Sequence, residues 1–199
     1  RAGQFELHLH VRHPMTQGLK SSQSHTELFA GVHVFNGNGQ GFFHDPHRFG
    51  AQRRKANIDG MVNLYEAARL HKVRRVVFAS SNHVMGFHRQ DHVVDALTPP
   101  RPDGFYGLSK AFGEDVSRLY FDRYGIETAC VRIGSSYPEP KDRRMLATWL
   151  SYDDLHRLLV ACLTTPVLGH SIIYGTSNNS VSWYDNRHAR HIGFVPQDS

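Results

Sequence analysis

The sequence predicts an α/β fold built on a parallel sheet. Two short runs rich in β-branched and aromatic residues, Val73–Ala79 and Glu127–Ile133, are typical of buried parallel strands. A helical pattern of apolar residues lies between them, as a β-α-β unit requires. The chain has 199 residues, 40% of them hydrophobic and 21% charged, which is enough for one domain with its own core.

The first strand and the helix after it both have recognisable ends. The strand delivers Ser80-Ser81-Asn82-His83 at its carboxyl end, and Pro99–Gly104 is a loop rich in helix breakers. The helix is predicted from about Tyr106 to the Tyr124-Gly125 stop. Its apolar residues at helical spacing, the predicted buried face, are Leu108, Phe112, Val116, Leu119 and Tyr120.

The second strand and the C-terminal third complete the predicted scaffold. The strand ends in Gly134-Ser135-Ser136, and Ser151 caps a helix that ends before Pro166. The predicted core face of that helix comprises Leu155, Leu158, Leu159 and Cys162. Ser171–Gly175 is then predicted as a strand. Cys130 and Cys162 each lie in an apolar run, which predicts buried, reduced thiols of a cytoplasmic protein.

The segment Tyr106-Gly-Leu-Ser-Lys110 carries the clearest chemical signal. Residues four apart share one helix face, so an ammonium lies beside a phenol. A nearby cation stabilises a phenolate, which turns a weak base into a useful one, and a serine such as Ser81 can hold the reacting oxygen. The pattern therefore predicts proton removal coupled to hydride transfer at the carboxyl ends of two adjacent strands.

These motifs resemble the extended short-chain dehydrogenases, the NAD-dependent epimerase/dehydratase family, and within it the bacterial uronate dehydrogenases. The matching segments are Val77–His83, Arg101–Lys110, Val131–Ser135, Pro138–Pro140 and Arg144–Trp149. The resemblance runs from about Asn57 to the end of the chain. It implies a partial Rossmann-like, doubly wound parallel sheet that lacks the family's first strands. It also implies NAD-dependent oxidation of galacturonate or glucuronate at C1, to the aldarolactone.

Carried over from the family, Tyr106 would be the general base that removes the C1 hydroxyl proton. Lys110 would stabilise its phenolate form and hold the nicotinamide ribose, while Ser81 would orient the C1 oxygen. Ser135 and Asn57 match further cofactor-binding positions. For Asn57 the alternative is an ordinary polar residue of a helix.

The same resemblance assigns Asn82, His83 and Ser136 to substrate binding. Arg144 matches the carboxylate clamp, a role for which the planar guanidinium is suited. The alternatives left open are a structural role for His83 and a solvated surface charge for Arg144.

The first 45 residues do not match the family. The Gly-x-x-Gly-x-x-Gly turn that receives the dinucleotide pyrophosphate is not found there. The glycines of Gly37-Asn-Gly39-Gln-Gly41 have the wrong spacing for a nucleotide-binding loop. The alternative is that this segment is a degraded form of the family's fourth strand and its glycine loop. We therefore predict an atypical, otherwise irregular segment at 1–45 and the C-terminal part of a Rossmann-like dehydrogenase domain at 46–199. On this hypothesis the N-terminal cofactor half is missing or altered.

Composition limits the partners. The net charge of +5 suits an anionic ligand such as a sugar acid or a dinucleotide, and no nucleic-acid motif accompanies the scattered basic residues. His8 and His10 share one face of an extended segment, but no third ligand accompanies them, so no metal is expected. No stretch approaches the length that spans a membrane, and homo-oligomerisation stays open.

Three hypotheses follow for the function. The first is a uronate dehydrogenase, which Arg144 and the Asn82-His83 pair favour. A sister sugar epimerase, reductase or dehydratase is the second, because the same Tyr and Lys would serve it. An inactive fragment or pseudoenzyme is the third, which the absent glycine turn favours.

Overall fold

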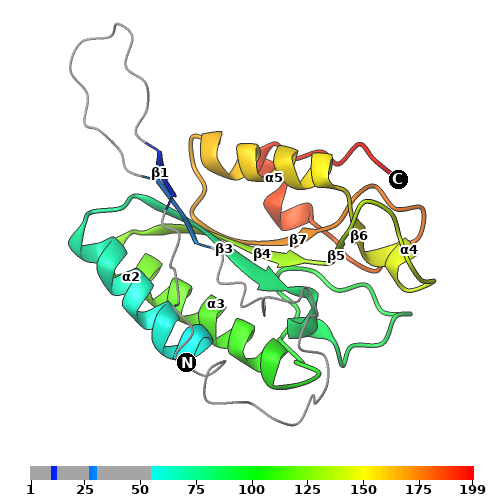
Figure 1. The fold of residues 1–199 in the computed structure, drawn as a ribbon, viewed down its shortest axis with the longest axis horizontal. Helices are drawn as coiled ribbons and strands as arrows, with labels where there is room; N and C mark the ends of the chain where they lie inside the picture. Colours follow the sequence, from blue (N-terminus) through cyan, green and yellow to red (C-terminus); the bar gives the residue numbers. More distant parts are fainter. Residues whose placement is uncertain (1–9, 13–26, 31–54) are drawn as a thin grey trace, which may run out of the picture.

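The computed structural model describes residues 10–12, 27–30 and 55–199, and in this part of the chain a five-stranded sheet lies between two helical layers (Figure 1). The strand order is β1-β2-β3-β4-β7. The strands are β1 (His10–Arg12), β2 (Glu27–Ala30), β3 (Arg75–Ser81), β4 (Glu127–Ile133) and β7 (His170–Gly175). Only β1 pairs antiparallel, and the other neighbours are parallel.

Helices cover both faces of this sheet (Figure 1). A π-helical turn, η1 (Lys55–Asp59), leads into α2 (Gly60–Leu70), which lies beside α3 (Phe105–Tyr124) on one face. On the other face, α5 (Tyr152–Thr164) and the 3₁₀ helix η3 (Arg187–Ile192) pack against the sheet. The predicted doubly wound α/β fold is confirmed.

Short elements gather where β3 and β4 end. The 3₁₀ helix η2 (Asn82–Met85) follows β3 directly. Beyond β4, the two-residue strand β5 (Ser135–Ser136) pairs with β6 (Trp149–Leu150), next to the short helix α4 (Met145–Thr148). A single edge of the sheet therefore carries most of the predicted site residues.

The boundary of β3 differs slightly from the sequence prediction. The predicted strand is Val73–Ala79, whereas β3 begins at Arg75 and runs on to Ser81. Backbone pairing explains the difference, because Ser80 and Ser81 are paired with Arg132 and Ile133 of β4. Ser81 is therefore the last residue of a buried strand, held more firmly than a loop residue would be.

The predicted buried face of α3 is partly wrong. Leu108 and Leu119 are 54% and 50% exposed, and Phe112 is only partly buried. Val116 and Tyr120 are buried as predicted, but the rest of the buried face carries small and polar residues, namely Gly107, Ser109, Lys110, Ala111, Gly113, Glu114 and Ser117. Close packing is the reason, since a Cβ on Gly113 would lie 2.5 Å from the Phe78 ring of β3.

The prediction of irregular structure in residues 1–45 is wrong at two places. His10–Arg12 and Glu27–Ala30 form β1 and β2. β2 pairs in parallel with β3, with Glu27 opposite Arg75 and Ala30 opposite Phe78. This backbone pairing defines the strand, although its own sequence shows no clear periodic pattern. The predictions that concern His8 and Gly37–Gly41 lie outside the described residues.

Both cysteines are buried and unbonded to one another, as predicted. Cys130 lies in β4 and Cys162 in α5, where burial raises the pKa of the Cys162 thiol to about 12. Within the described residues, no helix combines the length and the apolar character that crossing a bilayer demands.

Candidate active site

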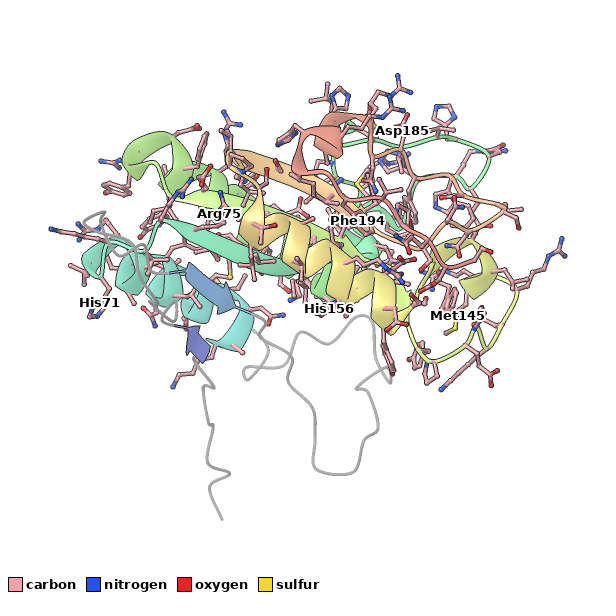
Figure 2. The ribbon with its side chains drawn as sticks, turned by 90° about the horizontal axis from the view of Figure 1, so that it is seen from above. His71, Arg75, Met145, His156, Asp185 and Phe194 are labelled. Carbon is pink, nitrogen blue, oxygen red and sulfur yellow. The ribbon has the colours of Figure 1, made fainter. Side chains whose placement is uncertain are left out.

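The predicted site residues converge at the carboxyl ends of β3 and β4. Ser81 ends β3, Ser135 and Ser136 follow β4, and Tyr106 lies in the first turn of α3. Figure 2 shows Met145 of α4 and Asp185 toward one end of the molecule and His71 at the opposite end. Ligands of doubly wound sheets bind at the carboxyl end of the strands.

Lys110 is a buried ammonium beside Tyr106. Its Nζ donates a hydrogen bond to the carbonyl of Ala79 (2.8 Å) and lies 5.7 Å from the centroid of the Tyr106 ring. Burial lowers the pKa of Lys110 to about 8, because water no longer solvates its charge. A cation held this close favours negative charge on the neighbouring phenol oxygen.

Asn57 and Ser109 support the first turn of α3. The amide Nδ2 of Asn57 donates to Ser109 Oγ (2.9 Å), and Ser109 Oγ donates to the carbonyl of Tyr106 (2.8 Å). Asn57 lies in η1 and is buried, 52 residues away in sequence from Ser109. This relay joins the turn before α2 to the backbone of Tyr106.

Ser81 and His83 lie at the junction of β3 and η2, where His83 contacts Tyr106. Ser81 Oγ accepts a hydrogen bond from the backbone N–H of His83 (3.2 Å) and caps η2. The His83 ring packs edge to face on the Tyr106 ring, with centroids 5.6 Å apart, and its Nδ1 lies 2.8 Å from a carboxylate oxygen of Asp103. The structure therefore brings Ser81, His83, Tyr106 and Lys110 together.

Ser135 and Ser136 differ in their partners. Ser135 Oγ is hydrogen-bonded to Thr148 Oγ1 of α4 (3.0 Å). The hydroxyl of Ser136 is buried and has no hydrogen-bond partner among the described residues. A buried polar group without a partner is costly, so this hydroxyl fits a position that a ligand would satisfy.

Asn82 and Arg144 both influence the ionisation of the Tyr184 phenol. Asn82 is buried at the start of η2, whereas Arg144 is an exposed residue immediately before α4. Burial raises the pKa of Tyr184, and the neighbouring Asn82 amide and Arg144 guanidinium oppose that rise. The Tyr184 ring stacks on Tyr174 at 4.6 Å. Arg144 has no ion-pair partner in residues 55–199, so its guanidinium remains available to a ligand carboxylate.

A buried ion pair lies beneath the site and is missed by sequence analysis. Glu114 of α3 accepts hydrogen bonds from Arg132 Nε (3.0 Å), Arg132 Nη2 (2.8 Å) and the Ser80 hydroxyl (2.6 Å). Arg132 also donates to the Tyr174 hydroxyl of β7 (2.9 Å). This network ties α3 to three strands. Its sequence signal is Arg132, a charged residue within the predicted buried strand Glu127–Ile133.

Comparison with known proteins agrees with this architecture. A sequence model described as the NAD-dependent epimerase/dehydratase family matches residues 30–168. The chain belongs to this family. It is 61% identical over 143 residues to a uronate dehydrogenase of Pseudomonas putida, covering 72% of this chain and 53% of that protein. The chain spans about half the length of the curated uronate dehydrogenases that it matches.

Solved structures support the same placement. The uronate dehydrogenase of Agrobacterium tumefaciens superposes with a TM-score of 0.74 at 49% identity, covering 76% of this chain and 57% of that chain. A mutant of that enzyme complexed with NAD has a TM-score of 0.70 at 51% identity, covering 71% of this chain and 54% of that chain. In residues 55–199 and the two short strands, no group of three metal-ligating side chains is found.

Proposed function

We propose that this protein oxidises a uronic acid, galacturonate or glucuronate, at C1 to the aldarolactone with NAD, in the cytoplasm. The observation that carries the proposal is the cluster of Ser81, Tyr106 and Lys110, in which Lys110 lies beside Tyr106 and both Ser81 and Tyr106 contact His83. The relatives of the chain are named uronate dehydrogenase. The free thiols of Cys130 and Cys162 are consistent with a reducing compartment. In this proposal residues 46–199 carry the catalytic part of the domain.

The residues at the strand ends fit a nicotinamide nucleotide. Ser136 offers a buried hydroxyl without a partner in the described part of the chain, and Lys110 uses one of its three donors on Ala79. Tyr106, Lys110, Ser135 and Asn57 are the residues that would hold or support the cofactor. When bound, NAD accepts a hydride from the substrate carbon.

The chain's own residues would handle the proton. The Tyr106 oxygen would remove the proton from the C1 hydroxyl, and the Lys110 ammonium would stabilise the phenolate. Ser81 Oγ, fixed at the end of β3, would hold the C1 oxygen in place. The Asn57–Ser109 relay would keep the first turn of α3, and with it Tyr106, in position.

The substrate would be held by groups from three elements. Asn82 and His83 of η2 would bind sugar hydroxyls, together with Ser136 of β5. Arg144 would bind the carboxylate, and a guanidinium can make two parallel hydrogen bonds to such a group. A uronic acid offers the hydroxyls and the carboxylate in one small ring.

The Tyr106→Phe variant tests the catalytic assignment. Galacturonate-dependent NADH formation should fall by about 10²- to 10⁴-fold, the usual loss when a positioned general base is removed. Tyr124→Phe is the matched control, because Tyr124 is the exposed last residue of the same helix. Activity of Tyr106→Phe within about threefold of the parent would contradict the proposed role.

The Arg144→Ala variant tests the substrate class. We expect a KM for galacturonate raised about tenfold or more, because a hydrogen bond to a charged group is worth about 1.5–3 kcal/mol. Galactose has no carboxylate, so its KM should hardly change. Arg143→Ala removes the neighbouring exposed cation and serves as the control. Equal losses on both sugars would show that Arg144 does not bind the carboxylate.

A further inference from the structure

The Glu114–Arg132 ion pair contacts both ends of residues 80–85, the segment in which β3 passes into η2. At one end, the Ser80 hydroxyl donates a hydrogen bond to Glu114 Oε1 (2.6 Å). At the other end, Arg132 Nη1 donates to the sulfur of Met85 (3.1 Å), the last residue of η2. A single ion pair therefore holds the segment at two points.

The geometry of the pair makes it a rigid anchor. Arg132 Nε and Nη2 donate to the two carboxylate oxygens of Glu114 at 3.0 and 2.8 Å, a bidentate arrangement. Because the guanidinium is planar, this arrangement also fixes the direction of Nη1, which reaches Met85 and the Tyr174 hydroxyl (2.9 Å). Ser80 lies opposite Arg132 in the pairing of β3 with β4, so both side chains are on the face of the sheet that α3 covers.

Stability alone does not account for such a pair. Glu114 and Arg132 are 5% and 2% exposed. Taking two charges out of water costs about as much free energy as their attraction returns, so apolar side chains of similar volume are often as stable. Apolar packing has no preferred direction, whereas a guanidinium and a carboxylate make directed hydrogen bonds. What the pair supplies is orientation of the groups that it contacts.

We infer that Glu114 and Arg132 are positioning residues for residues 80–85. Through the two ends of this segment they set the places of Ser81 and Asn82, the side chains proposed to hold the C1 oxygen and a sugar hydroxyl. The inference rests on the proposed function and deepens it. Both charged groups lie beneath the segment and act on the sugar only through it.

The decisive variant replaces the whole network by apolar side chains. Ser80→Ala, Glu114→Leu and Arg132→Met are combined, so that no buried partner of the pair loses its last hydrogen bond. The Tyr174 hydroxyl still donates to the Asp95 carbonyl (3.0 Å). The unfolding midpoint of this apolar variant should equal or exceed that of the parent.

The first test measures the segment without any ligand, by NMR of amide hydrogen exchange in the 199-residue chain. The His83 N–H donates to Ser81 Oγ (3.2 Å), and the Gly86 N–H donates to the His83 carbonyl (3.4 Å), so these amides report on the segment. In the apolar variant both should exchange about tenfold faster or more, while the amides of Val76–Phe78 in the middle of β3 should not change. Unchanged exchange at both reporters would overturn the inference.

The second test compares two ligands by calorimetric titration. In the apolar variant, galacturonate should bind about tenfold more weakly, because two groups that contact it are no longer fixed. Nicotinamide mononucleotide, proposed to bind at Lys110 and Ser135, should keep its affinity within about twofold. A purely structural role would leave both affinities unchanged or lower them together, and either result would overturn the inference.

A further pair of variants tests the inference without repacking the core. Arg75 and Glu127 form a second ion pair (2.8 Å) between β3 and β4, at the opposite end of the two strands. Glu127→Gln is therefore the matched control for Glu114→Gln, since each removes one charge from its pair and should lower the unfolding midpoint. Only Glu114→Gln should weaken galacturonate binding and speed exchange at Gly86 beyond the change that both variants share. Equal effects of the two variants would overturn the inference.

The tests also separate this inference from the proposed function. A parent chain that binds no galacturonate would refute the proposed function and the sugar-binding half of the inference. The exchange measurements need no ligand, so they would still decide whether the ion pair holds residues 80–85.

Discussion

At the scale of single residues, the site depends on polar side chains whose burial costs free energy. Lys110 is the clearest case, because it is buried and its lowered pKa of about 8 reflects lost hydration. An unfolded chain would bind its proton up to the ordinary pKa of about 10.4. Between these two pKa values the unfolded state holds more protons than the folded state, so stability rises with pH. Keeping Lys110 charged near neutrality therefore costs folding free energy.

We predict that Lys110→Met stabilises the fold below pH 8 and abolishes activity. The gain in unfolding free energy should be about 1–3 kcal/mol at neutral pH and should shrink as the pH rises toward the ordinary lysine pKa. Urea unfolding of both proteins across this pH range measures the difference. Lys141→Met, at an exposed lysine, is the control and should show no such pH dependence. A difference that does not vary with pH would contradict the argument.

At the scale of elements, the position of α3 decides the geometry of the site. Small residues on its buried face let it approach η2 and β3, and the Glu114–Arg132 ion pair anchors its middle to β4. Gly107 stands next to Tyr106 and against the His83 carbonyl. A methyl group at this point must push the first turn of α3 away from η2, since the contacted atom is backbone.

We predict that Gly107→Ala destabilises the protein by about 1–3 kcal/mol and lowers activity, because overpacking displaces the turn that carries Tyr106. Gly60→Ala is the matched control. A Cβ on Gly60, in the first position of α2, would lie 3.5 Å from the Lys55 carbonyl, an ordinary contact. Its replacement should be neutral or stabilising by about 0.5–1 kcal/mol. Thermal unfolding of both variants checks the contrast, and similar stabilities would refute it.

At the scale of the whole molecule, the sequence predicts what is local and misses what depends on distant contacts. The bounds of β4 match the prediction, and α3 and α5 begin and end within about a residue of it, because periodicity, the Ser151 cap and the Gly125 stop act locally. Asp103 and Arg132 acquire their partners only when the loop, α3 and the strands assemble. The short β2 pairs with a strand more than forty residues away, so no local pattern identifies it.

Cofactor affinity is also a property of the whole molecule. In the family, the pyrophosphate binds at a glycine turn and helix N-terminus, and the sequence before residue 46 contains no such turn. The residues at the ends of β3 and β4 would contact only the nicotinamide half of NAD. The adenosine and pyrophosphate groups should therefore add little binding free energy in this chain.

We predict that the 199-residue chain binds NAD with a Kd in the millimolar range, about −4 kcal/mol. Nicotinamide mononucleotide, which lacks the adenosine half, should bind about equally well, because both ligands would use the same contacts at Tyr106, Lys110 and Ser135. Calorimetric titration with each ligand measures the two affinities, and light scattering shows whether the sample is monodisperse. Micromolar NAD binding, together with mononucleotide binding weaker by about a hundredfold or more, would show that residues 1–54 supply phosphate contacts with no recognisable sequence signature.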